Sequence, residues 1–512
     1  MNKFRILIIS LGLVIVFGAC KKSFFDINQD PNRPTASAIT PDLTLAAQLT
    51  AIAGRNASTY DILNRWMGYW SASGSYSRGT VEMSYNITNT VMEGNWNNIY
   101  YVLGQLRNME TKAKESDMKF YQGMAKILSA HEWGVLVDCY GDVPFTNALD
   151  LIGNIRPTYS KGEDVYKALL PMIDEGLALI KAAGNDINIV SQDILFGGNK
   201  TNWAKFANTL KLRLMVHAYK TSIFNNSSEI AKITAEGSGF MGSGIGAMVQ
   251  PVYSADKPNP YYANHLHAIN GNEADNYNRA NCFSLDMMMS NNDIRYTRFY
   301  RTTKAPVAGA TYRCTTYGAD PKDDLNSDRT SGPGYGLIRV PESVFLTPPS
   351  GPTATALTGA TKPMWLMTSV EAMFLVAEAT ARGWIAGNAQ TAYENAVRES
   401  FTYLMLTTAD ANTYLAQANN SKIAWPAAGT LAEKIAVIMW QKYFALNGLQ
   451  ANETWTDWRR TGVVQPPLSI APERGSNPIP RRFLYPSGEF SYNASNVPQG
   501  TNQFTSKIFW DL

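Results

Sequence analysis

The 512-residue chain has little net charge, few cysteines and few histidines. Its 45 basic and 42 acidic residues nearly balance, so it lacks the excess of positive charge that binds nucleic acid. Its 25 prolines and 38 glycines are close to average usage, which excludes collagen-like and low-complexity chains. What it has in surplus is aromatic residues, including 12 Trp and 26 Tyr. Such rings suit recognition surfaces as well as hydrophobic cores.

Motifs of the common enzyme classes are missing. The chain has neither a G-x-S-x-G string nor a Walker A loop. His131-Glu132 begins a zincin-like string, but Val135 stands where the second histidine is required, and His131 fits a core stripe. The loop residues His265 and His267 lack a nearby cysteine that would complete a metal site. We therefore predict no enzyme, although a distant pair of carboxylates for glycoside hydrolysis stays open.

The first 19 residues are typical of an export signal. Lys3 and Arg5 precede an apolar run from Ile6 to Phe17 that is too short to span a bilayer. Cys20 directly follows two small residues, an arrangement that resembles a bacterial lipoprotein box. The pattern predicts a signal peptide at 1–19, lipidation of Cys20 and a lipid-anchored tether at 20–40. The alternative is an ordinary secreted protein that is cleaved nearby.

Three further cysteines are Cys139, Cys282 and Cys314. No CxxC spacing occurs among them, and an odd number leaves at least one thiol free or bonded elsewhere. We interpret them as buried and chemically inert.

Apolar residues recur at helical spacing over much of the chain. Residues 369–382 and 389–404 form a predicted helix pair, joined through Gly383 and Gly387, with the period of a tetratricopeptide unit. Long stretches rich in Gly, Pro, Asn and Tyr interrupt this pattern at 237–279 and 302–363, with weak strand signals at 311–316 and 336–340. We predict a mostly α fold. Its helical-repeat core covers about 41–236 and 364–465, with a loop-rich subdomain at 237–363 and an irregular segment at 466–512.

Several motifs occur together, in one order, over nearly the whole chain. They are Phe25-Asp26-Ile27-Asn28-Gln29-Asp30-Pro31-Asn32, Tyr140-Gly141-Asp142-Val143-Pro144-Phe145, the stretch 203–213 that begins Trp203-Ala204-Lys205-Phe206, Ala377-Glu378-Ala379, Trp455-Thr456-Asp457-Trp458-Arg459-Arg460 and Ile479-Pro480-Arg481-Arg482-Phe483. In these motifs the chain resembles the SusD/RagB family, closest to its SusD-like branch of outer-membrane nutrient-binding lipoproteins. Asn292-Asp293-Ile294-Arg295 departs from the Asp-Pro-Arg that relatives often have.

The resemblance implies a tetratricopeptide-like core with a loop-rich subdomain, placed at the cell surface of a Bacteroidetes-type bacterium. It also implies a SusC-like TonB-dependent β-barrel transporter as partner, for which the protein would capture an oligosaccharide. In a minority of the family the ligand is a peptide. Three alternatives to glycan capture are therefore a RagB-like peptide-binding protein, a glycoside hydrolase, and a scaffold that binds only protein.

A sugar site needs flat apolar faces together with amides, carboxylates or guanidinium groups. The first region that supplies both contains Trp66, Trp70, Tyr76 and Arg78, with Trp96 on a following helix. Trp66 and Trp70 also fit a helical stripe that favours the core. Tyr76 and Arg78 lie beyond this stripe, and we expect them to be the better ligand candidates.

The second region is a loop with little apolar content, where aromatic side chains alternate with amides. We expect its rings to be exposed, as we do for Tyr335 between two glycines. The alternative is a loop that packs on itself or on the partner barrel. The candidates here are Tyr261, Tyr262, Asn276, Tyr277 and Arg279.

Acidic residues of one loop partly match a calcium-binding pattern. Asp324, Asn326 and Asp328 have the spacing of an EF-hand, but Arg329 and Tyr335 stand where glycine and glutamate are required. We reject an EF-hand and predict no cofactor. A structural calcium on a different oxygen set, including Asp320 and Asp323, stays open beside a solvated acidic turn.

Overall fold

The structure is a computed structural model that describes residues 39–150, 152–184, 186–270, 272–340 and 357–511. The predicted signal peptide, lipidated Cys20 and most of the tether lie outside the described residues. No helix of the described ranges combines the length and the apolar character needed to cross a membrane.

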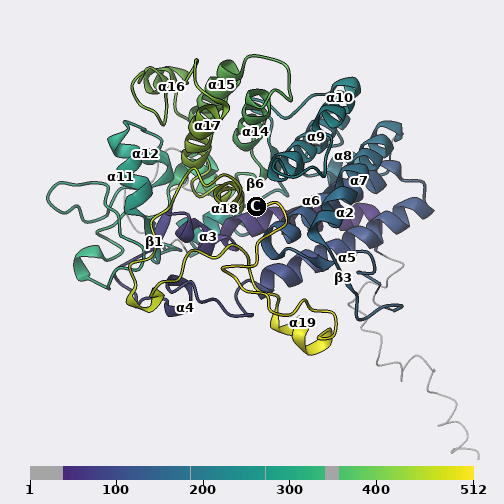
Figure 1. Ribbon diagram of the computed structural model, residues 1–512, viewed down its shortest axis with the longest axis horizontal. Coiled ribbons are helices and arrows are strands. Elements are labelled where there is room, and N and C mark those ends of the chain that lie inside the picture. The colour runs from purple at the N-terminus through teal and green to yellow at the C-terminus, as the bar shows by residue number, and fades with distance from the viewer. Residues whose placement is uncertain (1–38, 151, 185, 271, 341–356, 512) are drawn as a thin grey trace, which may run out of the picture.

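Most helices from the N-terminal half form one side of the molecule, on the right in Figure 1, whereas α3 (Asp61–Trp66) and α4 (Thr80–Met83) lie to the left of centre. At the centre of this side, α6 packs lengthwise on α7. The two backbones come close at Gly123 and Gly176, where a Cβ on Gly123 would lie 2.6 Å from Cγ1 of Ile180. The lack of a side chain at these two glycines therefore allows α6 and α7 to approach each other closely. The elements of this half are α2 (Pro41–Ser58), α3 (Asp61–Trp66), α4 (Thr80–Met83), α5 (Glu93–Glu115), α6 (Lys119–Tyr140), α7 (Gly162–Ala182), α8 (Ile189–Gln192), α9 (Lys200–His217) and α10 (Asn226–Glu236).

A second group of helices lies at the top of Figure 1 and includes the predicted pair. Helix α14 is capped by Thr368, α15 is capped by Asn388, and the turn between them places Gly383 at a φ of +75°. The tetratricopeptide-like pair is confirmed, and with it the mostly α fold. This group comprises α14 (Ser369–Ala381), α15 (Ala389–Tyr403), α16 (Thr408–Leu415) and α17 (Leu431–Ala445), and the next helix, α18 (Ala451–Thr461), lies at the centre of the molecule.

Between the two groups the chain forms only short elements, teal and green at the left of Figure 1. The predicted strand at 336–340 is wrong, because backbone hydrogen bonds close a 3-10 turn there instead. The predicted strand at 311–316 is reduced to one isolated bridge between Thr315 and Asn281. The elements are η2 (Tyr262–Leu266), α11 (Cys282–Ser290), α12 (Tyr296–Phe299), η3 (Asp323–Leu325), η4 (Tyr335–Ile338) and α13 (Leu357–Ala360).

A disulfide joins Cys282 to Cys314 inside this segment. The interpretation of these two cysteines as inert thiols is therefore wrong, whereas Cys139 is a buried free thiol as expected. A structural disulfide is typical of proteins that fold in an oxidising compartment. The bond fixes the start of α11 to the loop that carries the acidic residues.

Within the described residues, three two-stranded antiparallel sheets connect separate parts of the chain. Strand β1 pairs with β5 in the register Trp70 to Ala280, Ser71 to Arg279 and Ala72 to Asn278. This pairing ties the N-terminal helices to the loop-rich segment. The strands are β1 (Trp70–Ala72), β2 (Val143–Pro144), β3 (Tyr159–Ser160), β4 (Ala247–Val249), β5 (Asn278–Ala280) and β6 (Met364–Met367).

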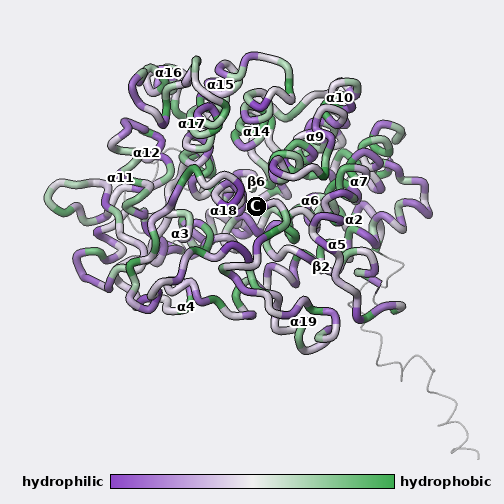
Figure 2. The backbone as a smooth tube through the Cα atoms, viewed as in Figure 1, coloured by the Kyte–Doolittle hydropathy of each residue, from purple (hydrophilic) through white to green (hydrophobic). Residues whose placement is uncertain are grey.

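The C-terminal segment, yellow in Figure 1, crosses the lower side of the molecule through η6 (Pro472–Arg474) and α19 (Ser487–Tyr492). Phe483 stacks on Trp66 with ring centroids 5.8 Å apart, and Trp510 is fully buried. Along the helices hydrophobic and hydrophilic stretches alternate (Figure 2), as expected for helices with one buried face. The irregular C-terminal residues thus complete the core.

Candidate functional site

The β1–β5 pairing brings together the two regions that the sequence marks for sugar binding. Immediately after the strand pair, the Ser73 amide donates to the Tyr277 carbonyl over 2.8 Å. The Tyr76 ring then meets the Tyr277 ring edge to face, with centroids 5.3 Å apart. We call Tyr76, Asn276 and Tyr277, together with Arg78, the aromatic face.

Exposure differs within the aromatic face. Tyr76 is 43% exposed, which is large for a tyrosine, and Asn276, next to Tyr277 in sequence, is also exposed. Tyr277 is half-buried, and the guanidinium of Arg65 lies 5.3 Å from its ring centroid. Burial raises the pKa of Tyr277, so its phenol stays protonated at neutral pH. Two rings and an amide therefore face solvent together.

Arg78 lies at the edge of this face and is held by two carboxylates. It forms an ion pair with Asp320 and a second one with Glu473, over 3.0 Å. Glu473 is 395 residues away in sequence, so no local pattern could have placed it here. Because both carboxylates are themselves exposed, Arg78 is oriented at the surface and still meets solvent.

The loop that carries Tyr76 is fixed to the acidic loop. The Gly74 amide donates to the Leu325 carbonyl over 2.7 Å, and the Ser327 amide donates to the Ser75 hydroxyl over 3.2 Å. A side chain at Gly74 would collide with the Lys322 and Leu325 backbone. Close backbone approach therefore requires glycine here and positions the Tyr76 ring.

Three tryptophans that the sequence left open between core and ligand site lie in the core. Trp66 is fully buried and packs against Trp455 and Phe483. Trp70 is 1% exposed and meets the His265 ring, and Trp96 is 3% exposed. None of the three offers a free face to a ligand in this structure.

The expectation that Tyr261, Tyr262 and Tyr335 are exposed is wrong. Tyr261 is buried against Trp365, with ring centroids 5.6 Å apart. Tyr262 and Tyr335 pack on either side of His267. The loop-rich segment has an aromatic core of its own, which a count of apolar residues along the chain does not reveal.

Arg279 is also buried rather than available to a ligand. One terminal nitrogen donates to the carbonyls of Asp275 and Asn278 over 3.0 and 2.7 Å. Burial and the nearby guanidinium of Arg301 lower the pKa of Arg279 to about 10. Arg301 forms an ion pair with Glu273. Arg279 therefore supports β5 from within, and the proposal that it contacts sugar hydroxyls directly has no geometric basis here.

The two loop histidines do not form a metal site with each other. His265 is buried, its Nδ1 lies 2.7 Å from an Asp275 oxygen, and its Nε2 lies 2.5 Å from the Ala57 carbonyl. Burial lowers its pKa, but Asp61 and Asp275 outweigh that effect and raise it. His265 thus serves as a link between α2 and the loop.

The carboxylates considered for calcium each face a cation of the protein. Asp320 pairs with Arg78, and Asp324 pairs with Arg313 over 2.9 Å. Asp328 lies 3.3 Å from Lys304, and the Asn326 side-chain oxygen accepts from the Asp328 and Arg329 amides. Asp323 pairs with Arg329. This arrangement is that of an Asx turn stabilised by ion pairs.

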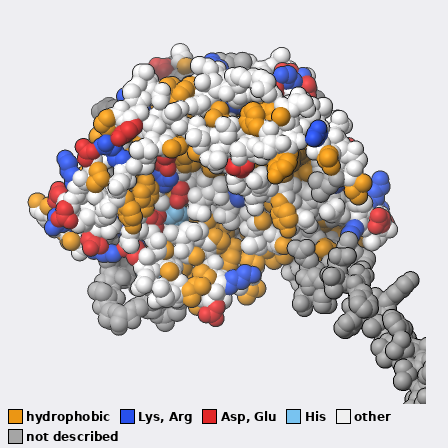
Figure 3. All heavy atoms as spheres, turned by 90° about the horizontal axis from the view of Figure 1, so that it is seen from below, with side chains coloured by type: hydrophobic (Ala, Val, Ile, Leu, Met, Phe, Trp, Pro, Cys, Tyr) orange, Lys and Arg blue, Asp and Glu red, His pale blue; other side chains and the backbone are white. Residues whose placement is uncertain are grey.

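Seen from below, charged side chains of both signs gather at the loop-rich end, at the left, while hydrophobic side chains are exposed in separate patches (Figure 3). Within the loop-rich segment the side chains of Lys304, Asp323 and Asp328 are exposed. The aromatic face thus lies in polar surroundings, which suit a hydroxyl-rich ligand better than an apolar one.

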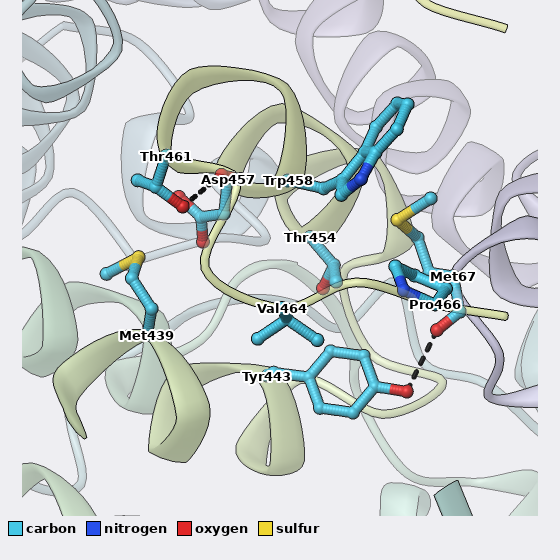
Figure 4. Close-up of a pocket in the computed structure, with 9 residues that line it drawn as sticks. All are labelled: Met67, Met439, Tyr443, Thr454, Asp457, Trp458, Thr461, Val464 and Pro466. Carbon is cyan, nitrogen blue, oxygen red and sulfur yellow. Dashed lines mark hydrogen bonds between the residues drawn. The ribbon is translucent and has the colours of Figure 1, made fainter. Parts of the chain in front are cut away.

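Two cavities of the helical body have a different character. The cavity between α17 and α18 has a volume of only about 10 Å³, room for about one water (Figure 4). Tyr443 at its wall donates to the Met67 carbonyl, and Thr461 donates to the Asp457 carbonyl. A groove of about 480 Å³ lies between α14 and α15 and is largely apolar, with Phe240, Met373 and Ile385 in its wall.

Comparison with known proteins identifies one family model over most of the chain. The model described as SusD-like, "Starch-binding associating with outer membrane", matches residues 31–486. No curated protein matches the chain.

Solved structures of similar fold come from Bacteroidetes. A SusD homologue from Bacteroides uniformis has 22% identity and a TM-score of 0.72, covering 92% of this chain and 99% of that one. A SusD homologue from Bacteroides fragilis has 20% identity and a TM-score of 0.72, covering 93% and 100%. A chitin-binding SusD homologue from Flavobacterium johnsoniae has 20% identity and a TM-score of 0.73, covering 91% and 98%.

Proposed function

Because the chain belongs to the SusD-like family of starch-binding proteins associated with the outer membrane, we propose that it captures an oligosaccharide on its aromatic face. The observation that carries the proposal is the exposed Tyr76 ring set edge to face on Tyr277, with the exposed Asn276 preceding Tyr277 in the chain. The ligand then passes to a SusC-like TonB-dependent β-barrel. The protein acts by binding, without cleaving the glycan.

The chemistry of the aromatic face suits a pyranose ring. The apolar C–H side of a sugar packs on the exposed Tyr76 ring, and amide and phenol groups pair with its hydroxyls. Arg78 is already oriented by Asp320 and Glu473, so it donates to a hydroxyl without a large loss of side-chain entropy. A small site of this kind gives modest affinity. When the protein closes over the barrel, the barrel adds contacts to the same ligand, and the effective concentration of the ligand at these contacts is high.

Anchoring follows from the same proposal. Lipidation of Cys20 holds the protein at the outer-membrane surface, and the following residues act as a tether to the helical body. Labelling of cells with a clickable fatty acid tests this step. Label is expected in the wild-type protein and not in the Cys20→Ser variant, and equal label in both contradicts the anchor.

Calorimetry with a panel of neutral oligosaccharides and peptides tests the ligand class. We expect heat of binding with at least one oligosaccharide and none with the peptides. Heat with peptides alone would replace glycan capture by peptide capture, and sugar hydrolysis during the titration would indicate an enzyme.

Two tyrosine variants then test the place of binding. Tyr76→Ala is expected to weaken the affinity for that oligosaccharide about tenfold, because the exposed ring is lost. Tyr101 is 60% exposed on α5, away from the aromatic face, so Tyr101→Ala is the matched control and should bind as the wild type does. Equal affinities of all three proteins would refute the aromatic face as the site.

A further inference from the structure

Two adjoining cavities lie where the loop-rich segment meets α14 and α15. Their volumes are about 140 and 320 Å³, and Met248 and Arg339 belong to the walls of both. Pockets that bind small molecules in proteins measure about 300–1,000 Å³. Together the two cavities therefore have the size of a small-molecule site, and none of the aromatic-face residues lies in their walls.

Two cations line this site without an ion pair. Neither Arg339 nor Lys362 forms a salt bridge within the described part of the chain, although both line the larger cavity. Arg339 has a φ of 57° and a ψ of 51°, a left-handed conformation that costs free energy for any residue except glycine. This strained backbone places the guanidinium 5.7 Å from the Tyr403 ring centroid.

The one carboxylate in the wall, Glu399, is occupied by other groups. Its oxygens accept from the Ser243 and Ser369 hydroxyls over 2.6 Å each and from the Gly244 amide over 3.0 Å. These bonds fix the carboxylate on α15, and no salt bridge joins it to Arg339 among the described residues. Arg339 and Lys362 outnumber Glu399 as charged groups in the two walls, so the site carries more positive than negative charge.

A buried hydroxyl completes the wall. Tyr403 is only 5% exposed, and its hydroxyl has no hydrogen-bond partner within the described residues. A buried donor without a partner has lost its hydrogen bonds to water, so native structures rarely keep one without a reason. An acceptor supplied by a ligand would satisfy it.

We propose that this site binds a small ligand that carries an oxyanion, either a carboxylate as in a uronic acid or a sulfate. Arg339 holds the oxyanion, Lys362 adds positive charge and Tyr403 donates its hydroxyl hydrogen. The remaining volume accommodates the body of a monosaccharide. This site is separate from the aromatic face and does not depend on glycan capture there.

Calorimetry at constant ionic strength with sodium D-glucuronate, sodium sulfate and D-glucose tests the proposal. We expect glucuronate or sulfate to bind the wild-type protein and glucose not to bind at this site. Binding of both anions identifies the oxyanion alone as the recognised group, and binding of glucuronate alone adds recognition of the sugar body.

Variants show whether the heat comes from this site. Arg339→Gln and Lys362→Gln should each weaken anion binding about tenfold or more, since each removes a charged partner. Arg156→Gln, at an exposed position elsewhere, should bind as the wild type does. Melting temperatures confirm that the variants are folded, and Lys362→Gln keeps the test valid if Arg339→Gln unfolds. The proposal is overturned if neither anion binds, or if the anion affinity is unchanged in both cavity variants.

Discussion

His217 provides a quantitative test of how the helical core is held together. The imidazole is fully buried on α9, with Nδ1 3.1 Å from an Asp138 oxygen and Nε2 3.0 Å from a Glu453 oxygen. Burial alone would lower its pKa, but the two carboxylates outweigh burial and raise the pKa of His217 from 6.5 to about 9. His217 is therefore a cation that links α6, α9 and α18 at neutral pH.

This pKa makes the stability of the protein fall at alkaline pH. The folded state keeps the His217 proton up to about pH 9, whereas the unfolded chain loses it near pH 6.5. The stabilisation is thus fully present below pH 6.5 and is lost as the pH rises through 9. The difference between the two pKa values corresponds to about 3 kcal/mol of unfolding free energy.

Urea unfolding at pH 6 and pH 9 measures this loss. The wild-type free energy of unfolding should fall by about 3 kcal/mol more than that of His217→Gln, which cannot titrate at this position. His267→Gln changes a half-buried loop histidine and keeps the His217 imidazole, so it should retain the loss of about 3 kcal/mol that His217 contributes. The subtraction removes the contributions of all other groups that titrate over the same range.

NMR of histidine-labelled protein gives a second readout that does not depend on a folded His217 variant. The His217 signal should titrate near pH 9. A His217 midpoint at or below pH 6.5 in the folded protein would refute the reasoning, as would equal pH dependence of the wild type and His217→Gln.

Three further predictions concern stability. Replacing Cys282 and Cys314 by Ser should lower the unfolding free energy by about 3–4 kcal/mol, because the disulfide closes a loop with a sequence separation of 32. An unchanged urea midpoint would contradict this prediction. Gly123→Ala should destabilise the protein by about 1–3 kcal/mol through overpacking against α7. Gly104→Ala, with open space around the new methyl group, should stabilise it by about 0.5–1 kcal/mol, so equal urea midpoints of the two glycine variants would refute the packing argument. Finally, because the carboxylates of residues 320–328 face cations, addition of calcium or EGTA should leave the melting temperature unchanged, and a shift of several degrees with calcium would show a bound ion.

Features set by neighbours in sequence could be predicted from the residues alone. The pair α14–α15 follows from an apolar stripe, an Asn cap and a glycine turn, all within one short window. The placement of His131 in the core follows equally from helical spacing. Where a local signal was strong, the structure agrees with it.

Features set by distant contacts could not be predicted in this way. Burial of Tyr261 depends on Trp365, and the orientation of Arg78 depends on Glu473, neither of which is nearby in sequence. The β1–β5 pairing, which unites the two predicted sugar-binding regions, rests on strands of three residues each with no alternating pattern to mark them. The polar composition of the loop therefore indicated the region that contains Asn276 and Tyr277. It wrongly predicted that the Tyr261 and Tyr262 rings of the same loop are exposed.

The most direct test of glycan capture is a crystal structure of the protein with the oligosaccharide that binds best in the calorimetric panel. We predict a sugar ring in van der Waals contact with the Tyr76 side chain and hydrogen bonds from Asn276 or Arg78 to its hydroxyls. An oligosaccharide bound elsewhere, such as in the groove between α14 and α15, with Tyr76 left in solvent, would contradict the account.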